Sequence, residues 1–431
     1  MYAVLLLLAP LILSFGVLLA GSSAQFVLLG LRAPIEGISV GWMGVISAAY
    51  FAGFGIGSLY CPKLVKEIGH IRTFAALASV ASGLALLLAL WPTPYGWLIL
   101  RLVTGFCFAG LYTVVESWMN ARSPNEYRGR ILSIYGVTIF GGFAIGPLIA
   151  NLGDPGGLML FAIASILISF ALVPVTLTRA GAPMIKPDEE EDEAQPRRYG
   201  LVRLFRETPL GVIGSFCVGA LQGSFTSLAS VYGASAGLDG EQTAFLVTAG
   251  LLAGLVAQYP LGWLSDRLDR RAVIVGVTVI GGGALLALYV TVLAHNPTYL
   301  MIMVASVLTG AAIFPIYALI IAHTNDWLPE SSLVPAAAAL LLMNSFGGMF
   351  GNIAASTSMN IFGPDSFFLF MACLNLAFGL FVLERMRRRP APESENTAYD
   401  YTPAALGTVP FGGAYEPPEA EEEAEPQPSQ P

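Results

Sequence analysis

Two side chains that carry charge, Arg101 and Glu116, stand inside one long apolar stretch of the sequence. Such charges are costly within a membrane and generally mark a binding site or a pathway for ions or solutes. Between them lie Gly105, Phe108 and Tyr112, at a helical spacing that puts all five residues on one face. At 1.5 Å per residue, Arg101 and Glu116 are about 22 Å apart and cannot pair. The stripe predicts a water-filled cavity with a cation at one end and a carboxylate at the other.

Each of these two charges also has a structural alternative, and the sequence leaves both alternatives open. The long side chain of Arg101 could extend outward to the membrane surface instead of facing a cavity. Glu116 could bond to the loop that carries Arg128 and Arg130 rather than carry protons. If Arg101 faces a cavity and Glu116 carries protons, the stripe takes part in binding or moving a solute. If the alternatives hold, the two residues only stabilise the protein.

Uncharged polar residues in other apolar segments are further candidates for the same cavity. These are Gln25, Gln222, Thr226 and Tyr317. Amides in membrane helices also hydrogen-bond between helices, so a second group of candidates is kept apart as helix contacts. This second group comprises Gln258, Asn344, Asn352 and Asn360.

Motifs for other chemistries are missing from the sequence. The four cysteines are scattered, so we predict neither a disulfide framework nor a metal site. The chain has no His-Glu-x-x-His or P-loop pattern. We therefore expect neither an enzyme nor a cofactor, and no nucleic-acid partner.

The elements that would position the candidate residues are membrane-spanning helices. Of the 431 residues, 55% are hydrophobic and only 12% are charged, about half the charged fraction of a soluble domain. A spanning helix needs about 20 apolar residues. The sequence predicts an all-α membrane protein with twelve such segments, at 3–29, 40–60, 73–91, 96–120, 131–153, 157–178, 209–233, 241–264, 272–294, 298–323, 331–355 and 365–385.

The distribution of lysine and arginine supports both the number and the orientation of these segments. Nineteen of the 21 basic residues fall in the segments 61–72, 121–130, 179–206, 265–271 and 385–389. With twelve spans, all five segments lie on one side of the membrane. Basic loops remain in the cytoplasm, so we expect a multi-pass protein of a bacterial-type inner membrane with both termini cytoplasmic.

The chain divides into two similar halves, and one acidic segment follows each half. We predict an N-terminal six-helix bundle at 1–178 and a C-terminal six-helix bundle at 209–388. Between them lies an acidic cytoplasmic loop at 179–208, and a tail at 389–431 follows. Both acidic segments are rich in proline, glutamate and alanine, so they cannot bury enough surface to fold. We expect the tail to be disordered.

A glycine followed by a basic stretch recurs at matching places in the two halves. In the first half Gly57 is followed by basic residues as far as Arg72. In the second half Gly262 is followed by Asp266, Arg267, Arg270 and Arg271. An acid at a helix end and arginines on the loop could form a latch across the cytoplasmic face that holds one gating state. Alternatively, the loops only fix orientation. Cys61 stands where the first half should have the acid, so a first-half latch should be weaker.

Glycines spaced by four residues recur in the fifth and eleventh spans. They are Gly142 and Gly146, followed by Pro147, and Gly347 and Gly351. Small residues let helix backbones approach closely in a membrane, so these positions are predicted to pack helices together. Two six-helix halves with repeated motifs favour a binding site at the interface of the halves.

These motifs together resemble the major facilitator superfamily over residues 1–388. The loop Gly262-x-x-x-Asp266-Arg267-x-x-Arg270-Arg271 is similar to the loop signature of the family, with Asp269 in place of a glycine. Arg101-x-x-x-Gly105 and Gly142-x-x-x-Gly146-Pro147 resemble two further family motifs. The end of the fourth span, from Glu116 to Asn120, is similar to the YcaD-like branch.

The resemblance implies a function that the residues alone do not show. It implies a secondary active transporter that moves a small solute by alternating access, with protons as the candidate coupling ion. It also implies that spans one, four, seven and ten line the cavity, which favours Gln25, Arg101, Gln222 and Tyr317. We expect a monomer in the lipid bilayer. The alternative is a receptor or scaffold of the same fold that transports nothing, which the incomplete first-half loop motif and the acidic tail favour.

Overall fold

The computed structural model describes residues 2–122, 128–177, 201–294, 298–329 and 332–388. Within these residues, twelve helices are long and apolar enough to cross a membrane, which confirms the predicted number. The described residues contain helices and turns but no β-strand. Most of the predicted acidic loop and the whole predicted tail lie outside the described residues, so both stay predictions.

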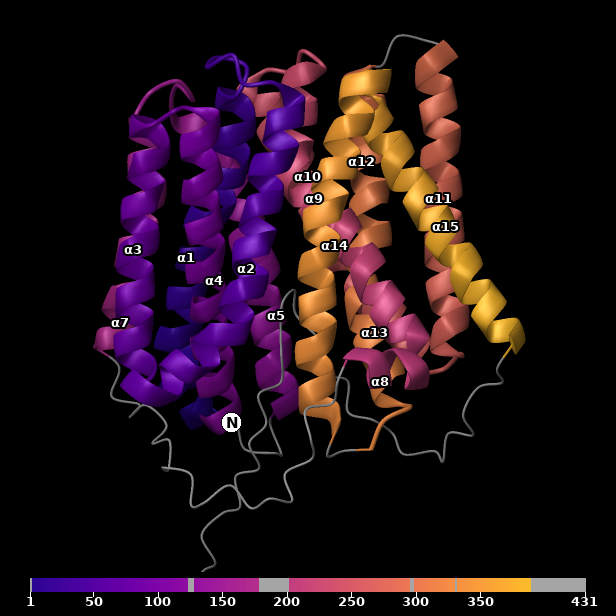
Figure 1. The fold of residues 1–431 in the computed structure, drawn as a ribbon, viewed down its shortest axis with the longest axis horizontal. Coiled ribbons are helices and arrows are strands. Elements are labelled where there is room, and N and C mark those ends of the chain that lie inside the picture. The colour runs from indigo at the N-terminus through magenta and orange to yellow at the C-terminus, as the bar shows by residue number, and fades with distance from the viewer. Residues whose placement is uncertain (1, 123–127, 178–200, 295–297, 330–331, 389–431) are drawn as a thin grey trace, which may run out of the picture.

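Two groups of helices lie side by side, one from each half of the chain (Figure 1). The N-terminal half contains α1 (Tyr2–Arg32), α2 (Val40–Ile68), α3 (His70–Leu90), α4 (Pro94–Arg122), α5 (Arg128–Ile145), the 3-10 helix η1 (Gly146–Leu152), α6 (Met159–Phe170) and α7 (Leu172–Thr176). The C-terminal half contains α8 (Leu201–Glu207), α9 (Pro209–Ser235), α10 (Gly240–Ser265), α11 (Arg270–Ala294), α12 (Tyr299–Ile313), α13 (Ile316–Asn325), α14 (Leu333–Phe362) and α15 (Ser366–Arg388).

Several helix boundaries differ from the predicted spans. Helix α2 continues to Ile68, so Lys63 and Lys66 lie on a helix rather than in a loop. The tenth span is interrupted at Phe314 and Pro315, which separate α12 from α13. Proline lacks a backbone N–H and cannot continue the hydrogen-bond ladder of a helix, which explains this interruption.

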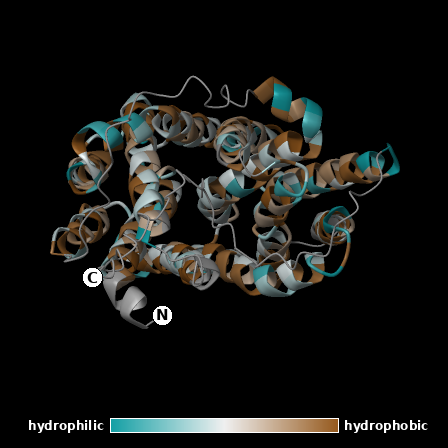
Figure 2. Ribbon diagram, turned by 90° about the horizontal axis from the view of Figure 1, so that it is seen from below, coloured by the Kyte–Doolittle hydropathy of each residue, from teal (hydrophilic) through white to brown (hydrophobic). Residues whose placement is uncertain are grey.

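The bundle has two ends that we name by their charge. The basic face is the end where α2 joins α3, where α10 joins α11 and where α15 ends, and it carries arginines such as Arg72, Arg267 and Arg388. The opposite face is the other end of the bundle. Figure 2 looks along the helices and shows that hydrophobic residues make up much of most of them, and many large hydrophobic side chains, such as Ile56, Ile280 and Leu380, are exposed. That distribution suits a bundle surrounded by lipid.

The predicted glycine pairs lie where two helices of one half touch. A Cβ added at Gly142 would lie 2.8 Å from the Gly16 backbone oxygen of α1, and one at Gly146 would lie 2.5 Å from the Ser23 Cβ. In the second half, a Cβ at Gly351 would lie 2.5 Å from the Cα of Ala220 in α9. The contact between α1 and α5 is therefore repeated by the contact between α9 and α14, as a duplicated architecture requires.

The neighbouring glycines 141 and 142 provide a matched test of this packing. The Cβ of leucine would meet α1 at Gly142, whereas nothing lies within 4 Å of a Cβ at Gly141. We expect Gly142→Leu to lower the free energy of unfolding by about 1–3 kcal/mol, as overpacking does. Gly141→Leu should leave it nearly unchanged. Thermal unfolding of the purified proteins measures both, and equal effects would contradict the packing role of Gly142.

The two halves meet closely at the opposite face. Helix α1 contacts α9 there, where Gly30 packs on Ser230, and α2 contacts α14, where Gly44 packs on Ser356. A hydrogen bond from the Thr248 hydroxyl to the Ala144 carbonyl oxygen, 3.1 Å long, joins α10 to α5. In this structure the halves thus touch at the opposite face through these small residues, and aromatic rings also pack between them, with Phe51 on Gly348 and Phe140 5.9 Å from Phe314.

Candidate functional site

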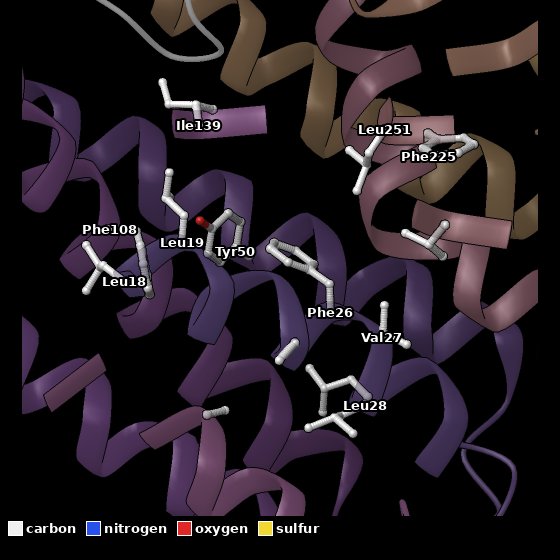
Figure 3. Packing of buried hydrophobic residues seen from close by; sticks show 14 of the residues in the cluster. Leu18, Leu19, Phe26, Val27, Leu28, Tyr50, Phe108, Ile139, Phe225 and Leu251 are labelled. Carbon is white, nitrogen blue, oxygen red and sulfur yellow. The ribbon is translucent and has the colours of Figure 1, made fainter. Parts of the chain in front are cut away.

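Arg101 lies inside the N-terminal half, with its guanidinium group against two adjacent aromatic rings. Its Cζ is 4.1 Å from the centre of the Phe26 ring of α1 and 4.3 Å from the centre of the Tyr50 ring of α2. Figure 3 shows these two rings next to each other. The side chain is only 1% exposed. Arg101 therefore faces the interior of the bundle, and the alternative that it extends to the membrane surface does not hold in this structure.

The position of the Tyr50 ring follows from the close contact between α2 and α4. A Cβ added at Gly105 would overlap the Tyr50 backbone oxygen, and one at Gly53 would overlap the Leu102 backbone oxygen. Because both helices carry glycine where they cross, their backbones touch one turn away from Arg101. Neither Phe26 nor Tyr50 was among the predicted site residues, since no spacing along the chain connects them to Arg101.

The guanidinium group is buried without an anionic partner. Among the described residues, neither terminal nitrogen of Arg101 has a hydrogen-bond partner. Each cation–π contact stabilises a desolvated cation by about 2 kcal/mol, whereas removing an ion from water costs several kcal/mol. Buried polar atoms in native proteins nearly always have partners. The arrangement thus leaves two directed donors available to a carboxylate, phosphate, hydroxyl or carbonyl oxygen of a bound molecule.

Glu116 lies farther along α4, toward the basic face, and is 5% exposed. Its Oε1 accepts a hydrogen bond of 2.9 Å from the hydroxyl group of Tyr135 in α5. The side chains of Arg128 and Arg130, the alternative partners of Glu116, lie outside the part of the chain that is described. Tyr135 was not among the predicted partners of Glu116, although both residues belong to the N-terminal half.

Aromatic rings occupy the space between Arg101 and Glu116. Successive ring centres are 4.9–6.3 Å apart, and the run passes through Tyr50, Phe54, Tyr112, Phe15 and Tyr135. Phe108, also on the stripe, is fully buried. Aromatic rings thus pack against the stripe on α4 in this structure. They fill the place where a water-filled cavity was predicted. The sequence identified the α4 face correctly but gave no information on the rings that α1, α2 and α5 place against it.

The two halves are equivalent around α4 and α12, except for the charge. Gly105 packs on the Tyr50 backbone oxygen, and Gly310 packs on the backbone oxygen of Gly250. Tyr112 and Tyr317 each lie seven residues after these glycines, so they occupy equivalent positions in the two halves. Arg101 and Ser306 each lie four residues before the glycines and are equivalent in the same way. The Ser306 hydroxyl donates to the Leu246 carbonyl oxygen at 2.6 Å. The C-terminal half therefore has a satisfied neutral group where the N-terminal half has a buried cation.

Gln222 and Thr226 of α9 have structural partners. The Gln222 Nε2 donates to the backbone oxygens of Ile313 and Phe314, at 3.0 and 3.2 Å, where the tenth span is interrupted. The Thr226 hydroxyl donates to the backbone oxygen of Gln222 in its own helix. These hydrogen bonds stabilise the helix break and α9, and they occupy groups that were predicted to face a solute.

Gln25 and Tyr317 remain candidates for binding because their polar atoms are buried without partners. Both amide atoms of Gln25 and the hydroxyl oxygen of Tyr317 lack hydrogen bonds among the described residues. Among the second group, Asn344 bonds to the Ser215 backbone oxygen of α9 at 3.4 Å, as a contact between helices should. Asn360 is exposed.

The loop between α10 and α11 forms ion pairs within the C-terminal half. Arg270 contacts Asp266 at 3.3 Å and Asp326, just after α13, at 2.9 Å. Burial raises the pKa of Asp326 above its ordinary value, although the charge and hydrogen bond of Arg270 act in the opposite direction. The predicted latch thus connects Arg270 to α13 of its own half rather than crossing to the other half. Arg267 stacks on the Trp263 ring instead.

Arg271 and Asp269 form a third ion pair at this loop, at 2.8 Å. Burial alone would raise the pKa of Asp269. Hydrogen bonds from the side chain and backbone of Arg271, together with its charge, outweigh burial and hold the pKa below its ordinary value. Asp269, which replaces the glycine of the family signature, is therefore an ionised partner that fixes Arg271.

The first-half loop has a neutral contact at the same place. His70 begins α3 as Arg270 begins α11, and its Nε2 lies 3.0 Å from the Ser117 hydroxyl oxygen of α4. Gly57 does not match Gly262 in register, because α2 ends at Ile68, eleven residues after Gly57, whereas α10 ends at Ser265, three residues after Gly262. The expected equivalence of Cys61 with Asp266 is therefore wrong in register, since Cys61 lies within α2, whereas Asp266 directly follows the end of α10. Arg72 is exposed.

Comparisons with known proteins agree with this architecture. The family model of the Major Facilitator Superfamily matches residues 4–255 and 212–415. An uncharacterized MFS-type transporter of Enterobacter sp. (strain 638) is 27% identical over 371 residues, which are 83% of this chain and 90% of the relative. An uncharacterized MFS-type transporter YcaD of Escherichia fergusonii is 26% identical over 357 residues, 81% of this chain and 88% of the relative.

Solved structures show the same fold at low sequence identity. A mutant form of the nucleoside transporter NupG has a TM-score of 0.72 at 13% identity, covering 88% of this chain and 99% of its own. A D-xylose-proton symporter has a TM-score of 0.65 at 14% identity, covering 91% and 99%. Since the family model matches most of the sequence and the twelve helices repeat the same contacts in two halves, this chain belongs to the Major Facilitator Superfamily.

Proposed function

We propose that this protein is a secondary transporter that carries a small solute across a bacterial inner membrane by alternating access. The observation that carries the proposal is the contact between the halves at the opposite face, where Gly30 packs on Ser230 and Gly44 packs on Ser356. Such small residues bring the backbones of the two halves close together. In a mechanism in which the halves rock about a central site, this contact is the one that opens and closes at the opposite face.

We further propose that Arg101 binds an oxygen-bearing group of the solute, with an anionic group preferred. Its two unpartnered terminal nitrogens form a planar fork that suits a carboxylate or phosphate. The neighbouring rings of Phe26 and Tyr50 both contact this fork. Burial away from water strengthens the attraction for an anion.

The direct test of the function is transport by the purified protein. A library of small metabolites is first screened for compounds that raise the melting temperature, because ligands of the native state stabilise it. Uptake of the stabilising compounds is then measured in proteoliposomes. Uptake that saturates with solute concentration is the expected result. Stabilisation without flux of any compound would contradict transport and favour the receptor or scaffold alternative.

Glu116 is the candidate proton carrier of this transporter. Glu116→Gln can still accept the hydrogen bond from Tyr135 but cannot take up and release a proton. We expect this variant to lose accumulation of solute against its gradient under an imposed pH gradient while it keeps solute exchange. Accumulation equal to wild type would contradict the role of Glu116. Tyr135→Phe retains the carboxylate and serves as the control, with accumulation expected to persist.

We propose that the basic face is cytoplasmic, as the distribution of lysine and arginine predicts. Cysteine labelling in intact cells tests this in a variant without the native cysteines. Ile35→Cys, at a position 60% exposed on the opposite face, should react with a membrane-impermeant maleimide. Arg267→Cys, exposed on the basic face, should react only after lysis. The reverse pattern would show that the orientation is inverted.

A further inference from the structure

A cavity of about 490 Å³ opens on the opposite face, at the boundary between the two halves. This volume is within the usual range for small-molecule sites. The N-terminal half contributes residues at the end of α1 and in η1, and the C-terminal half contributes residues around the α9–α10 loop. The walls include Leu31, Pro34, Asn151, Ala234, Leu238 and Glu241.

Glu241 gives this cavity a negative charge with which no described residue pairs. It lies in the first turn of α10 and is exposed, and its carboxylate has no hydrogen bond or ion pair among the described residues. The neighbouring Asp239 is already engaged, because its Oδ1 accepts the backbone N–H of Gln242 at 2.7 Å. The other wall residues named above are apolar, apart from the amide of Asn151.

The surroundings of the cavity carry the same sign of charge. The described loops and helix ends of the opposite face hold Glu36, Asp154, Asp239 and Asp365 in addition to Glu241. Arg32, at the end of α1 on this face, is 6% exposed and is paired with Glu36 at 2.8 Å. A face with excess negative charge raises the local concentration of cations.

We propose that this cavity binds an organic cation with an apolar body, such as a protonated aralkylamine. Glu241 contacts the ammonium group, while Leu31, Leu238 and Pro34 contact the apolar part. Because both halves contribute walls, the bound cation stabilises the arrangement in which the opposite face is closed. The site is separate from Arg101, which selects the opposite charge. Binding is independent of the proposed transport function, and only an inhibitory effect on flux rests on that function.

Three probes that share a phenylethyl or benzyl body test the charge preference: phenethylammonium, 2-phenylethanol and phenylacetate. Apparent dissociation constants come from the melting temperature of the full-length protein at increasing probe concentrations. We expect phenethylammonium to bind most tightly and Glu241→Gln to weaken it about fivefold, the upper range for an exposed ion pair. Glu384→Gln, an exposed acid at the end of α15 on the basic face, changes the net charge equally and should have no effect.

A second variant tests the cavity itself. Leu238→Trp fills the space, and we expect it to weaken phenethylammonium and phenylethanol binding alike. Melting temperatures without probe are recorded for each variant, because Glu241 also favours the positive N-terminal end of α10. Equal affinity of wild type and Glu241→Gln for phenethylammonium would overturn the proposal, as would tighter binding of phenylacetate. If both variants bind phenethylammonium more weakly but the probe does not inhibit solute flux in the wild type, the binding site stands and its proposed effect on transport is wrong.

Discussion

Replacing Arg101 with leucine should reduce solute uptake by about 10- to 100-fold, the range for losing a hydrogen bond to a charged group. The same substitution should leave the melting temperature unchanged or raise it. The guanidinium is buried against Phe26 and Tyr50, and its terminal nitrogens have no partner among the described residues, so the native protein carries the cost of its desolvation. Replacing buried charge with an apolar side chain of similar volume is often neutral or stabilising. Loss of transport together with retained stability distinguishes a binding role from a structural one.

Two further variants make this result interpretable. Arg101→Lys retains the charge but not the planar fork, so we expect intermediate uptake. Arg32→Leu is the matched control, because Arg32 also lies near an aromatic ring, Phe161, at 5.3 Å. Unlike Arg101, it already has a carboxylate partner in Glu36. Its replacement should lower stability and leave uptake nearly intact. An Arg101→Leu variant that transports normally would contradict the proposed anion site.

Joining the two halves by a disulfide at the α2–α14 contact should abolish uptake. A Cβ built at Gly55 lies 3.4 Å from the Ser345 Cβ, close to the separation of about 3.5–4.5 Å in disulfides. Gly55→Cys and Ser345→Cys, combined in a variant without the native cysteines, should therefore cross-link on oxidation. Because alternating access requires the halves to move apart, uptake should cease when the bond forms and return after reduction.

A disulfide within one half provides the control for this experiment. Ser82 of α3 and Ser165 of α6 lie in the N-terminal half, with hydroxyl oxygens 2.8 Å apart. A cross-link between Ser82→Cys and Ser165→Cys should leave uptake largely unchanged, since each half moves as a unit. Full uptake by a completely cross-linked Gly55–Ser345 variant would contradict the rocking mechanism. Loss of uptake in both variants would instead indicate motion within the N-terminal half.

The features that could be predicted from the sequence are those that depend on local composition. Apolar runs of sufficient length specify a membrane helix wherever they occur, so the number of spans was correct. Glycine spacing identified α5 and α14 as helices that pack closely on a neighbour, because only residues without a side chain permit such close backbones. Charge within an apolar run identified Arg101 and Glu116 as unusual, since burial of charge is costly in any membrane helix.

The partners of these residues could not be predicted, because they depend on how each helix is rotated in the bundle. These helices are apolar on nearly all sides, so hydropathy does not show which face turns inward. Only the tertiary structure places Phe26 and Tyr50 on Arg101, Tyr135 on Glu116, and Gln222 at the helix break before Pro315. It also directs Arg270 to Asp326 within one half. The sequence by itself determined a twelve-helix protein with two intramembrane charges, because hydrophobicity and charge act locally. The packing of helices distant in sequence decided what surrounds those charges, because contacts between apolar helices depend on three-dimensional shape.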